Sequence, residues 1–440
     1  MLFYSTNDPT HKVSAKEAIF RGLPADKGLY MPERIDPLPD RFFANLANMS
    51  FAEIGFWVSR QLLGTEIPDR QLRKMVEETL SFPAPVVRLD DRKYVLELFH
   101  GPSLAFKDFG ARFMARLMHH YNDSSQPLTI LVATSGDTGG AVAAGFYDTP
   151  GIEVVILYPS GKVSELQEKQ LTTLGKNIRA IEVDGSFDDC QALVKEAFLD
   201  EDLRKRLRLS SANSINISRL IPQTFYYFEA FRQLGPGDPV VFCVPSGNFG
   251  NLTAGLIAKQ LGLPVHHFIA ATNRNDVIPQ FLETGRYTPK PSVPTLSNAM
   301  DVGAPSNFAR MANLYGQIMG IDAPTQEVFE AMQRDISGYA FDDLATEVAV
   351  REVEKFFGYT IDPHGAVGYL ALDEWQRDHP ATRGVILETA HPSKFLPDMR
   401  RILDKDIPVP DRLASLAHRE KVATKMSPAF ADFKSYLLRH

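Results

Sequence analysis

The chain has 440 residues, 44% of them hydrophobic, so it is long enough for two or three globular domains. Its 47 basic and 54 acidic residues give a net charge of −7 and an isoelectric point of about 5.9, and the basic residues are scattered. This composition argues against a nucleic-acid-binding surface and leaves the binding of anions to local pockets.

Cysteine usage, histidine spacing and hydropathy exclude further classes. Cys190 and Cys243 stand in unrelated contexts, so neither a disulfide framework nor a thiolate metal site is expected. None of the 11 histidines forms an HExxH or similar arrangement. The N-terminus has no basic head followed by an apolar run, and no segment reaches the ~18 apolar residues of a membrane span. We therefore expect a cytoplasmic protein without a metal, a membrane or a nucleic-acid partner.

Residues 1–88 are predicted to form a small, largely helical N-terminal domain. Helical patterning is clearest at residues 51–63, and the prolines at 83 and 85 halt a helix.

Beyond residue 88 short β-branched runs alternate with helical patterns. Such near-continuous apolar strands are typical of parallel sheets covered on both faces, so the fold class is α/β. The stretch GPGDP at 235–239 separates two such blocks and predicts two lobes, 89–235 and 236–440, with a cleft between them. The proline-rich stretch at 288–294 is interpreted as a long loop. The clearest strands are predicted at 129–134, 154–159, 240–245 and 384–389.

Residues 98–108 (LFHGPSLAFKD) place Lys107 behind a turn and among bulky apolar neighbours. Burial lowers the pKa of a lysine and leaves a nucleophilic amine that can form a Schiff base. Lys107 is therefore a candidate anchor for pyridoxal phosphate. Taken alone, a solvated surface lysine is the simpler interpretation.

Two glycine-containing loops between a strand and a helix are candidate anion sites. One is SGDTGG at 135–140 and the other is SGNFGN at 246–251. Glycines let the backbone approach an anion, and the N–H groups at a helix start face it with the positive end of the dipole. Ordinary strand-to-helix turns are the alternative, and Asp137 or Thr138 would then be an N-cap.

Two further segments carry polar groups that suit a ligand. In residues 210–219 (SSANSINISR), Asn213 and Arg219 are candidate phosphate ligands, whereas Ser214 and Ser218 are better explained by a capped helix entry. In residues 388–395 (ETAHPSKF), a hydroxyl at a strand end is a candidate to face a cofactor ring. His364 is interpreted as structural.

Five segments together resemble the threonine synthase family of pyridoxal-phosphate enzymes, in the tryptophan-synthase β-subunit class with fold type II. They begin at residues 98, 133, 211, 245 and 389 and follow the family's order. The opening GLYMP at 28–32 also looks like that family's N-terminal domain. The resemblance covers most of the chain and is least clear in the last 40 residues.

The resemblance implies a role for each matching residue. Lys107 would bind pyridoxal 5'-phosphate covalently and then move protons. The cofactor phosphate would be held by Gly247, Asn248, Phe249, Gly250 and Asn251. Thr389 would meet the pyridine nitrogen. The substrate would be held by Ser135, Gly136 and Thr138 at its carboxylate and by Asn213 and Arg219 at its phosphate. Asp137 is placed with the substrate-facing residues, although related enzymes often have asparagine there.

The implied activity is that of a carbon–oxygen lyase that converts O-phospho-L-homoserine and water to L-threonine and phosphate, the last step of threonine biosynthesis. The protein would be a monomer or a homodimer. Alternatives are a phospho-lyase or a threonine or serine dehydratase of the same fold, and, from another class, a non-catalytic phosphate-metabolite binder.

Overall fold

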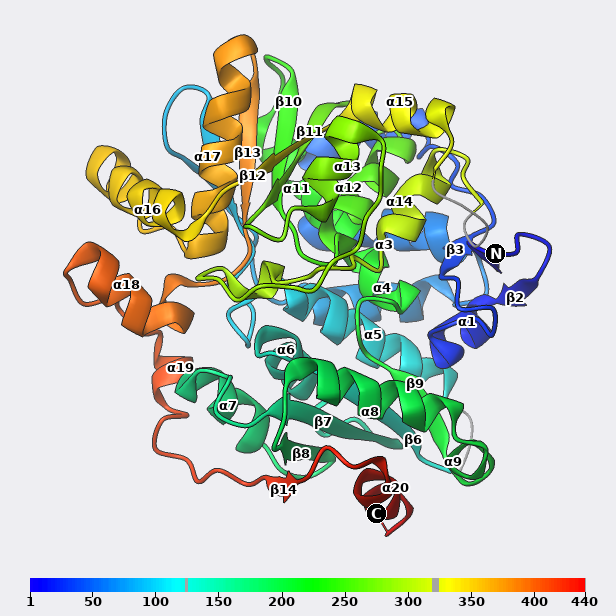
Figure 1. Cartoon of the computed structure of the whole chain (residues 1–440). Coiled ribbons are helices and arrows are strands. Elements are labelled where there is room, and N and C mark those ends of the chain that lie inside the picture. The colour runs from blue at the N-terminus through cyan, green and yellow to red at the C-terminus, as the bar shows by residue number, and fades with distance from the viewer. Residues whose placement is uncertain (123–125, 319–323, 440) are drawn as a thin grey trace.

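Two β-sheets, one above the other in Figure 1, form the two lobes of the molecule. The computed structural model describes residues 1–122, 126–318 and 324–439. The upper sheet has the order β12-β11-β10-β13-β5-β4 and is parallel except where β4 meets β5. The lower sheet has the order β14-β8-β7-β6-β9 and is parallel throughout. This confirms the predicted α/β class.

The strands have the following bounds. The upper sheet contains β4 (Val86–Arg88), β5 (Lys93–Glu97), β10 (Val240–Pro245), β11 (Val265–Thr272), β12 (Ile336–Ala340) and β13 (Arg383–Glu388). The lower sheet contains β6 (Leu128–Ala133), β7 (Ile152–Pro159), β8 (Ile178–Val183), β9 (Arg208–Ser211) and β14 (Thr424–Met426). The four predicted strands correspond to β6, β7, β10 and β13, each within two residues at either end.

Alternating side chains of β10 bury both faces of the upper sheet. Val241 and Cys243 join the cluster formed with α17 (Pro363–Asp378), whereas Phe242 and Val244 join the main core with α11 (Phe225–Leu234) and α12 (Gly250–Gln260). All six residues of the strand are buried. A parallel strand covered on both faces needs this continuous apolar run, which is why the pattern predicted it.

The lower sheet is covered in the same way. Its outer face packs against α8 (Phe187–Leu199) and α20 (Phe430–Arg439), and its inner face packs against α5 (Lys107–Tyr121) and α6 (Asp137–Phe146). The inner helices α5 and α6 lie between the two sheets in Figure 1.

The remaining helices connect and cover the sheets. They are α7 (Glu165–Thr172), α9 (Glu201–Arg206), α10 (Ile217–Leu220), α13 (Val277–Thr284), α14 (Phe308–Leu314), α15 (Gln326–Asp335), α16 (Asp343–Phe357), α18 (Leu396–Leu403) and α19 (Asp411–Ala414). Three short 3-10 helices lie among them, at η2 (Ile221–Thr224), η3 (Asn298–Met300) and η4 (Pro392–Phe395).

The N-terminal region combines helices with a small sheet that was not predicted. Its helices are α1 (Ala15–Arg21), α2 (Asp40–Asn45), α3 (Phe51–Leu63) and α4 (Asp69–Thr79), with η1 (Leu46–Asn48) between α2 and α3. The antiparallel sheet has the order β2-β1-β3 and consists of β1 (Leu2–Ser5), β2 (Lys12–Ser14) and β3 (Tyr30–Pro32). Strands of three or four residues carry too little periodicity to be recognised in sequence.

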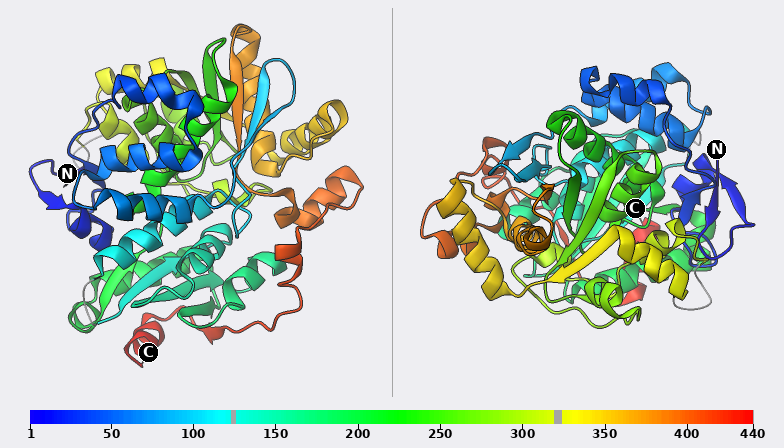
Figure 2. Two further views of the ribbon diagram at one scale, coloured as in Figure 1. Left: turned by 180° about the vertical axis from the view of Figure 1, so that it is seen from behind. Right: turned by 90° about the horizontal axis from the view of Figure 1, so that it is seen from above.

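The two sheets do not follow the predicted boundaries 89–235 and 236–440. Strand β5 belongs to the upper sheet, where it pairs with β13, and β14 crosses back to pair with β8 in the lower sheet. Figure 2 shows the C-terminal segment, in red, running down to the lower lobe. Each lobe is therefore built from two separate parts of the chain.

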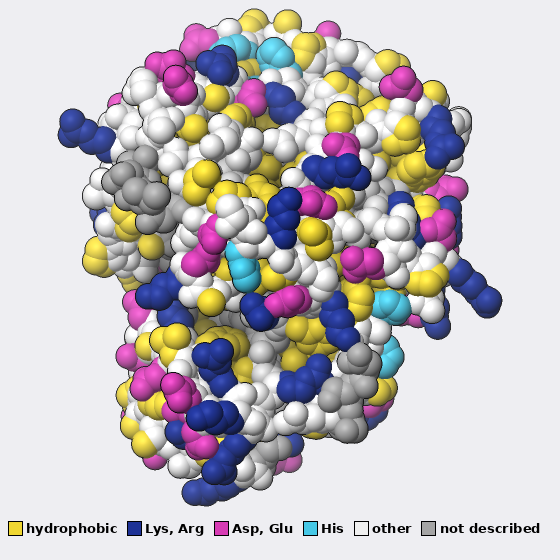
Figure 3. All heavy atoms as spheres, turned by 90° about the vertical axis from the view of Figure 1, so that its right-hand side faces the viewer, with side chains coloured by type: hydrophobic (Ala, Val, Ile, Leu, Met, Phe, Trp, Pro, Cys, Tyr) yellow, Lys and Arg dark blue, Asp and Glu magenta, His cyan; other side chains and the backbone are white. Residues whose placement is uncertain are grey.

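The surface charges, the cysteines and the helices agree with what the composition predicted. On the face seen in Figure 3, Lys and Arg side chains are interspersed with Asp and Glu. Both cysteines are free and buried. None of the helices in the described part of the chain combines the length and apolar character that a membrane crossing needs.

The packing of the C-terminal helix α20 on the lower sheet leads to a prediction about local stability. Phe433 of α20 is fully buried against the lower sheet. Phe433→Ala leaves a cavity that costs about 3–5 kcal/mol, so the amides of α20 and β14 should exchange with solvent roughly 100-fold faster. Hydrogen exchange read by mass spectrometry measures this. Leu344→Ala, at a position that is 72% exposed, is the control. Unchanged exchange in α20 would mean that the helix is not held by this contact.

Candidate active site

The chain leading into Lys107 is hydrogen-bonded to the segment that follows β13. Ala105 and Ala390 form an antiparallel bridge, and the N–H of Phe106 donates to the carbonyl of Thr389 over 2.9 Å. Lys107 is the first residue of α5, and Thr389 is buried with 6% of its surface exposed. Two predicted site residues that are far apart in sequence are thus neighbours.

Asp108 holds the turn before Lys107. Its Oδ2 accepts the N–H of Ser103 over 2.8 Å, and a Cβ on Gly101 would collide with the carboxylate. The side chain is fully buried, and its Oδ1 has no partner among the described residues. Burial raises the pKa of Asp108 to about 6, although the bond from Ser103 opposes the shift. The sequence interpretation assigned no role to this residue.

The amine of Lys107 lies in a group of buried charges. Its side chain is 17% exposed, and its Nζ lies 3.9 Å from Oδ2 of Asp137. Burial lowers the pKa of Lys107, the charge of Asp137 raises it, and Lys394 and Arg219 lower it. Desolvation is the largest of these effects, so the pKa of Lys107 lies below its ordinary value, which increases the share of the nucleophilic amine.

The loop at 135–140 opens α6 as predicted, but Asp137 does not cap the helix. Gly136 occupies the N-cap position with φ 146° and no side-chain cap bond, a conformation that favours glycine. Thr134 holds the turn by accepting the N–H groups of Gly136 and Gly139 over 3.0 and 2.9 Å. Ser135 and Thr138 are partly exposed at this helix start.

The side chain of Asp137 instead forms the most buried ion pair of the site. Nζ of Lys394 lies 2.7 Å from its Oδ1, and the two side chains are 1% and 5% exposed. Gln167 also donates to Oδ1, over 2.9 Å. Burial alone would raise the pKa of Asp137, but Lys394 and Lys107 outweigh it and hold the pKa well below its usual range. Asp137 is therefore a carboxylate.

In the segment at 210–219, Asn216 rather than Ser214 caps the helix. Its side chain accepts the N–H of Ser218 over 3.1 Å and donates to the carbonyl of Ile19 in the N-terminal region. Asn213 donates to the carbonyl of Ala133 at the end of β6 over 3.0 Å. This bond places Asn213 beside the loop that opens α6.

Arg219 is 3% exposed and is incompletely paired. One terminal nitrogen donates to the carbonyl of Ala212, while Nε has no partner among the described residues. A Cβ on Gly110, one turn after Lys107, would come within 2.7 Å of that Nε. Burial lowers the pKa of Arg219 to about 10, against the charge of Asp108, so the guanidinium stays charged at neutral pH.

The loop at 246–251 has the features of an anion cradle. Phe249 has a left-handed φ of 58° at the N-cap of α12, and a Cβ on Gly247 would collide with the carbonyl of Ala299. Over Gly250 a Cβ would meet nothing nearer than Asn307 at 3.5 Å and Ser214 at 3.8 Å. A Cβ there would make only ordinary van der Waals contacts, and of the first N–H groups of the helix that of Leu252 already donates to Oδ1 of Asn251 over 3.0 Å.

Asn251 and Asn248 support this loop with their side chains. Asn251 accepts from the Ser246 hydroxyl over 2.7 Å and donates to the carbonyl of Pro245 over 2.8 Å. Oδ1 of Asn248 accepts from Ser306. Both polar atoms of the Asn251 side chain are thus engaged within the loop, so its predicted contribution to a ligand rests on its backbone N–H.

His364 is structural, as the sequence suggested. Its Nδ1 lies 2.6 Å from Asp362, and its Nε2 accepts the N–H of Ala299 over 3.2 Å. Ala299 is the residue against which Gly247 packs. His364 thereby holds the segment on which the loop at 246–251 packs.

Two functional candidates escaped the sequence interpretation. Lys394 lay inside the segment at 388–395, in an apolar context like that of Lys107, but was given no role. Arg310 is fully buried in α14 and donates to carbonyls of Tyr30, Ser214 and Ile215. It joins the N-terminal region to the segment at 210–219, and nothing in its local sequence marks it.

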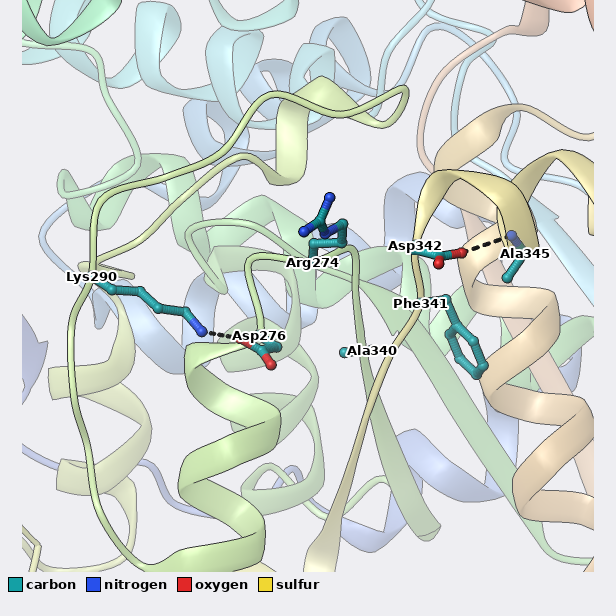
Figure 4. Close-up of a pocket in the computed structure, with 7 residues that line it drawn as sticks. All are labelled: Arg274, Asp276, Lys290, Ala340, Phe341, Asp342 and Ala345. Atoms are coloured by element: carbon teal, nitrogen blue, oxygen red, sulfur yellow. Dashed lines mark hydrogen bonds and ion pairs between the residues drawn. The ribbon is translucent and has the colours of Figure 1, made fainter.

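A separate hollow of about 590 Å³ lies at the carboxyl ends of β11 and β12 (Figure 4). Figure 4 shows Lys290 reaching Asp276 and the carboxylate of Asp342 directed at the N–H of Ala345. None of the predicted site residues lines it. No group of three or more His, Cys, Asp or Glu side chains in the described ranges is arranged for a metal ion.

Three family models, which overlap where they meet, together match residues 2–437 of the chain. The model described as pyridoxal-phosphate dependent enzyme matches residues 80–388, the threonine synthase N terminus matches 2–80, and the threonine synthase C-terminal model matches 365–437. The threonine synthase of Escherichia coli is 43% identical over 442 residues, and that of Haemophilus influenzae is 44% identical over 441. Each alignment covers all of both chains.

Solved structures agree with these sequence matches. The threonine synthase of Escherichia coli superposes with a TM-score of 0.91 at 44% identity, covering all of both chains. The PLP-bound threonine synthase from Brucella melitensis superposes with a TM-score of 0.93 at 34% identity, covering 100% of this chain and 99% of that one. The similarity thus extends over the N-terminal region and both lobes.

The buried carboxyl of Asp108 generates a prediction about stability and pH. Since its pKa is raised to about 6 from 3.8, the folded protein holds a proton there that the unfolded chain releases. This group therefore lowers the free energy of unfolding as pH rises from about 4 to 6, by up to about 3 kcal/mol. Asp108→Asn should remove that loss, so the variant gains stability relative to the parent between these pH values.

Thermal unfolding of both proteins across pH 4–7 measures the difference. Asp188→Asn, at a position on α8 away from the site, is the control and should follow the parent. A constant difference between Asp108→Asn and the parent would show that Asp108 is ionised throughout.

Proposed function

This chain belongs to the threonine synthase family of pyridoxal-phosphate-dependent enzymes, and on that basis we propose that it converts O-phospho-L-homoserine and water to L-threonine and phosphate. The observation that carries the proposal is the desolvated amine of Lys107 at the start of α5, with anion-facing groups around it. An amino-acid substrate with a phosphate needs one seat for each anion and a reactive amine between them.

The cofactor-binding residues fit the group that the family requires. We propose that the N–H groups of residues 247–251 hold the cofactor phosphate, because this glycine-containing loop opens α12 and a helix start favours an anion. Thr389, adjacent to the chain that carries Lys107, would face the pyridine nitrogen. A hydroxyl there leaves that nitrogen less positive than a carboxylate would.

Lys107 is the proposed covalent anchor and proton carrier. Pyridoxal phosphate, when bound, supplies an electron-withdrawing ring that stabilises negative charge on the substrate carbons. The amine of Lys107 would remove the proton from Cα of the substrate and return a proton to its terminal carbon. Such transfers are efficient when the pKa of the amine is near the working pH, and burial moves it in that direction.

The substrate would lie between the loops of the lower lobe. Ser135, Gly136 and Thr138 at the start of α6 would bind its carboxylate through hydroxyl and main-chain donors. Arg219 and Asn213 would bind its phosphate, and the unpaired Nε of Arg219 supports this role. A charged guanidinium at a third anion-binding position favours a phosphorylated substrate over plain serine or threonine.

The two cysteines are free and buried, which supports action in the reducing cytoplasm.

Lys107 is tested by trapping and by activity together. Borohydride reduction of the enzyme with pyridoxal phosphate should fix the cofactor on Lys107, as located by peptide mass spectrometry. Lys107→Ala should lose the adduct and at least about 1,000-fold of the turnover of O-phospho-L-homoserine. Lys162→Ala, at an exposed position, should retain both. An adduct on another lysine in the unaltered enzyme would overturn the assignment.

Arg219 is tested by the Michaelis constant. Arg219→Gln removes a charge-assisted contact, so KM for O-phospho-L-homoserine should rise about 10- to 100-fold. The absorbance of bound cofactor should not change. Arg208→Gln, half-buried on β9 and bonded to Asn122, is the matched control. If Arg219→Gln keeps the KM of the parent, the phosphate seat must be elsewhere.

A further inference from the structure

Lys394 reaches from the segment after β13 into the loops of the lower lobe. Its Nζ lies 2.7 Å from Oδ1 of Asp137 and donates to the carbonyl of Ser103, also over 2.7 Å. The side chain is 1% exposed. A fully buried ammonium is costly unless it is paired, so this contact needs the carboxylate.

The carboxylate of Asp137 is held with its two oxygens in different roles. Oδ1 receives both Lys394 and Nε2 of Gln167, and the Gln167 amide is oriented by the hydroxyl of Ser164, which donates to its Oε1 over 3.0 Å. Oδ2 is left facing the amine of Lys107 at 3.9 Å. That separation is too long for a hydrogen bond, whereas the pair with Lys394 has the length of one.

The distances decide which lysine carries the partner charge. Attraction between opposite charges falls with separation, and the hydrogen bond adds to the shorter pair. Asp137 is therefore neutralised mainly by Lys394. The attraction of Asp137 for a proton on Lys107 is therefore largely offset by the positive charge of Lys394, and Arg219 opposes it further.

We propose that Lys394 is a positioning residue that balances the charge of Asp137 and so keeps the amine of Lys107 in its uncharged, reactive form. This inference rests on the proposed role of Lys107 and deepens it. The balance has two sides, since Asp137 attracts a proton to Lys107 and Lys394 repels it. Removing the charge of Lys394 should therefore raise the proton affinity of Lys107, and removing the charge of Asp137 should lower it.

The proton affinity of Lys107 can be measured without turnover. Trace acetylation of the full-length chain, freed of cofactor, is followed by peptide mass spectrometry as a function of pH, because only the uncharged amine reacts. Lys394→Gln keeps a hydrogen-bond donor but removes the charge. The midpoint for Lys107 should then rise by about one pH unit or more, which is roughly a 10-fold loss of labelling below the midpoint.

Asp137→Asn should shift the midpoint the other way, to lower pH, and the double variant should lie between the two single ones. Lys259→Gln, which breaks an ion pair of 2.8 Å with Asp335 in the upper lobe, should leave Lys107 unchanged. Thermal unfolding identifies any variant that fails to fold. If Lys394→Gln fails, Asp137→Asn still tests the direction in which the midpoint of Lys107 shifts. The exposed Lys162 serves as the internal standard for reagent reactivity.

Shifts of the same sign in both single variants, or none in either, would overturn the proposal. A structural role alone does not produce opposite shifts. The outcome is also separate from the proposed function: an unaltered protein that makes no threonine would refute the activity, whereas the pH midpoints depend only on the buried charges.

Discussion

The cost of removing a lysine ammonium from water is the constraint on which this site depends. Lys107 is the first residue of α5, where desolvation outweighs the attraction of Asp137. The carboxylate could reverse that balance, but Lys394 occupies its other oxygen at 2.7 Å. The lowered pKa of one amine therefore depends on charges placed on three different segments.

The architecture brings those segments together. In a parallel sheet the loops after the strands meet at one end of the sheet, and here the segment after β13 pairs with the chain that leads into α5. The upper sheet contributes the loop at 246–251 and the segment from Thr389 to Lys394, whereas the lower sheet contributes Asp137 and Arg219. Arg310 donates to the carbonyls of Tyr30 and Ile215, and His364 accepts the N–H of Ala299, so both side chains support the backbone around the site.

The sequence predicted what depends on local patterns. Apolar runs identified β10 and β13, and the glycines of the two anion loops identified the helix starts behind them. Membership of the two sheets was not predictable, because β5 and β14 pair with strands far away in the chain. The burial of Lys394 and Arg310 was not predicted for the same reason. Tertiary packing decides whether a basic residue is buried and which groups it contacts. Asp137 does not cap α6 and forms an ion pair with Lys394, and its place among the substrate-facing residues stays a prediction.

The claim that this site makes threonine is tested most directly by product stoichiometry. The full-length enzyme with pyridoxal phosphate is incubated with O-phospho-L-homoserine, and phosphate, threonine and 2-oxobutyrate are measured in one sample. The account predicts equal amounts of threonine and phosphate from the start of the reaction. Phosphate accompanied by 2-oxobutyrate and no threonine would contradict it and identify an eliminating enzyme of the same fold.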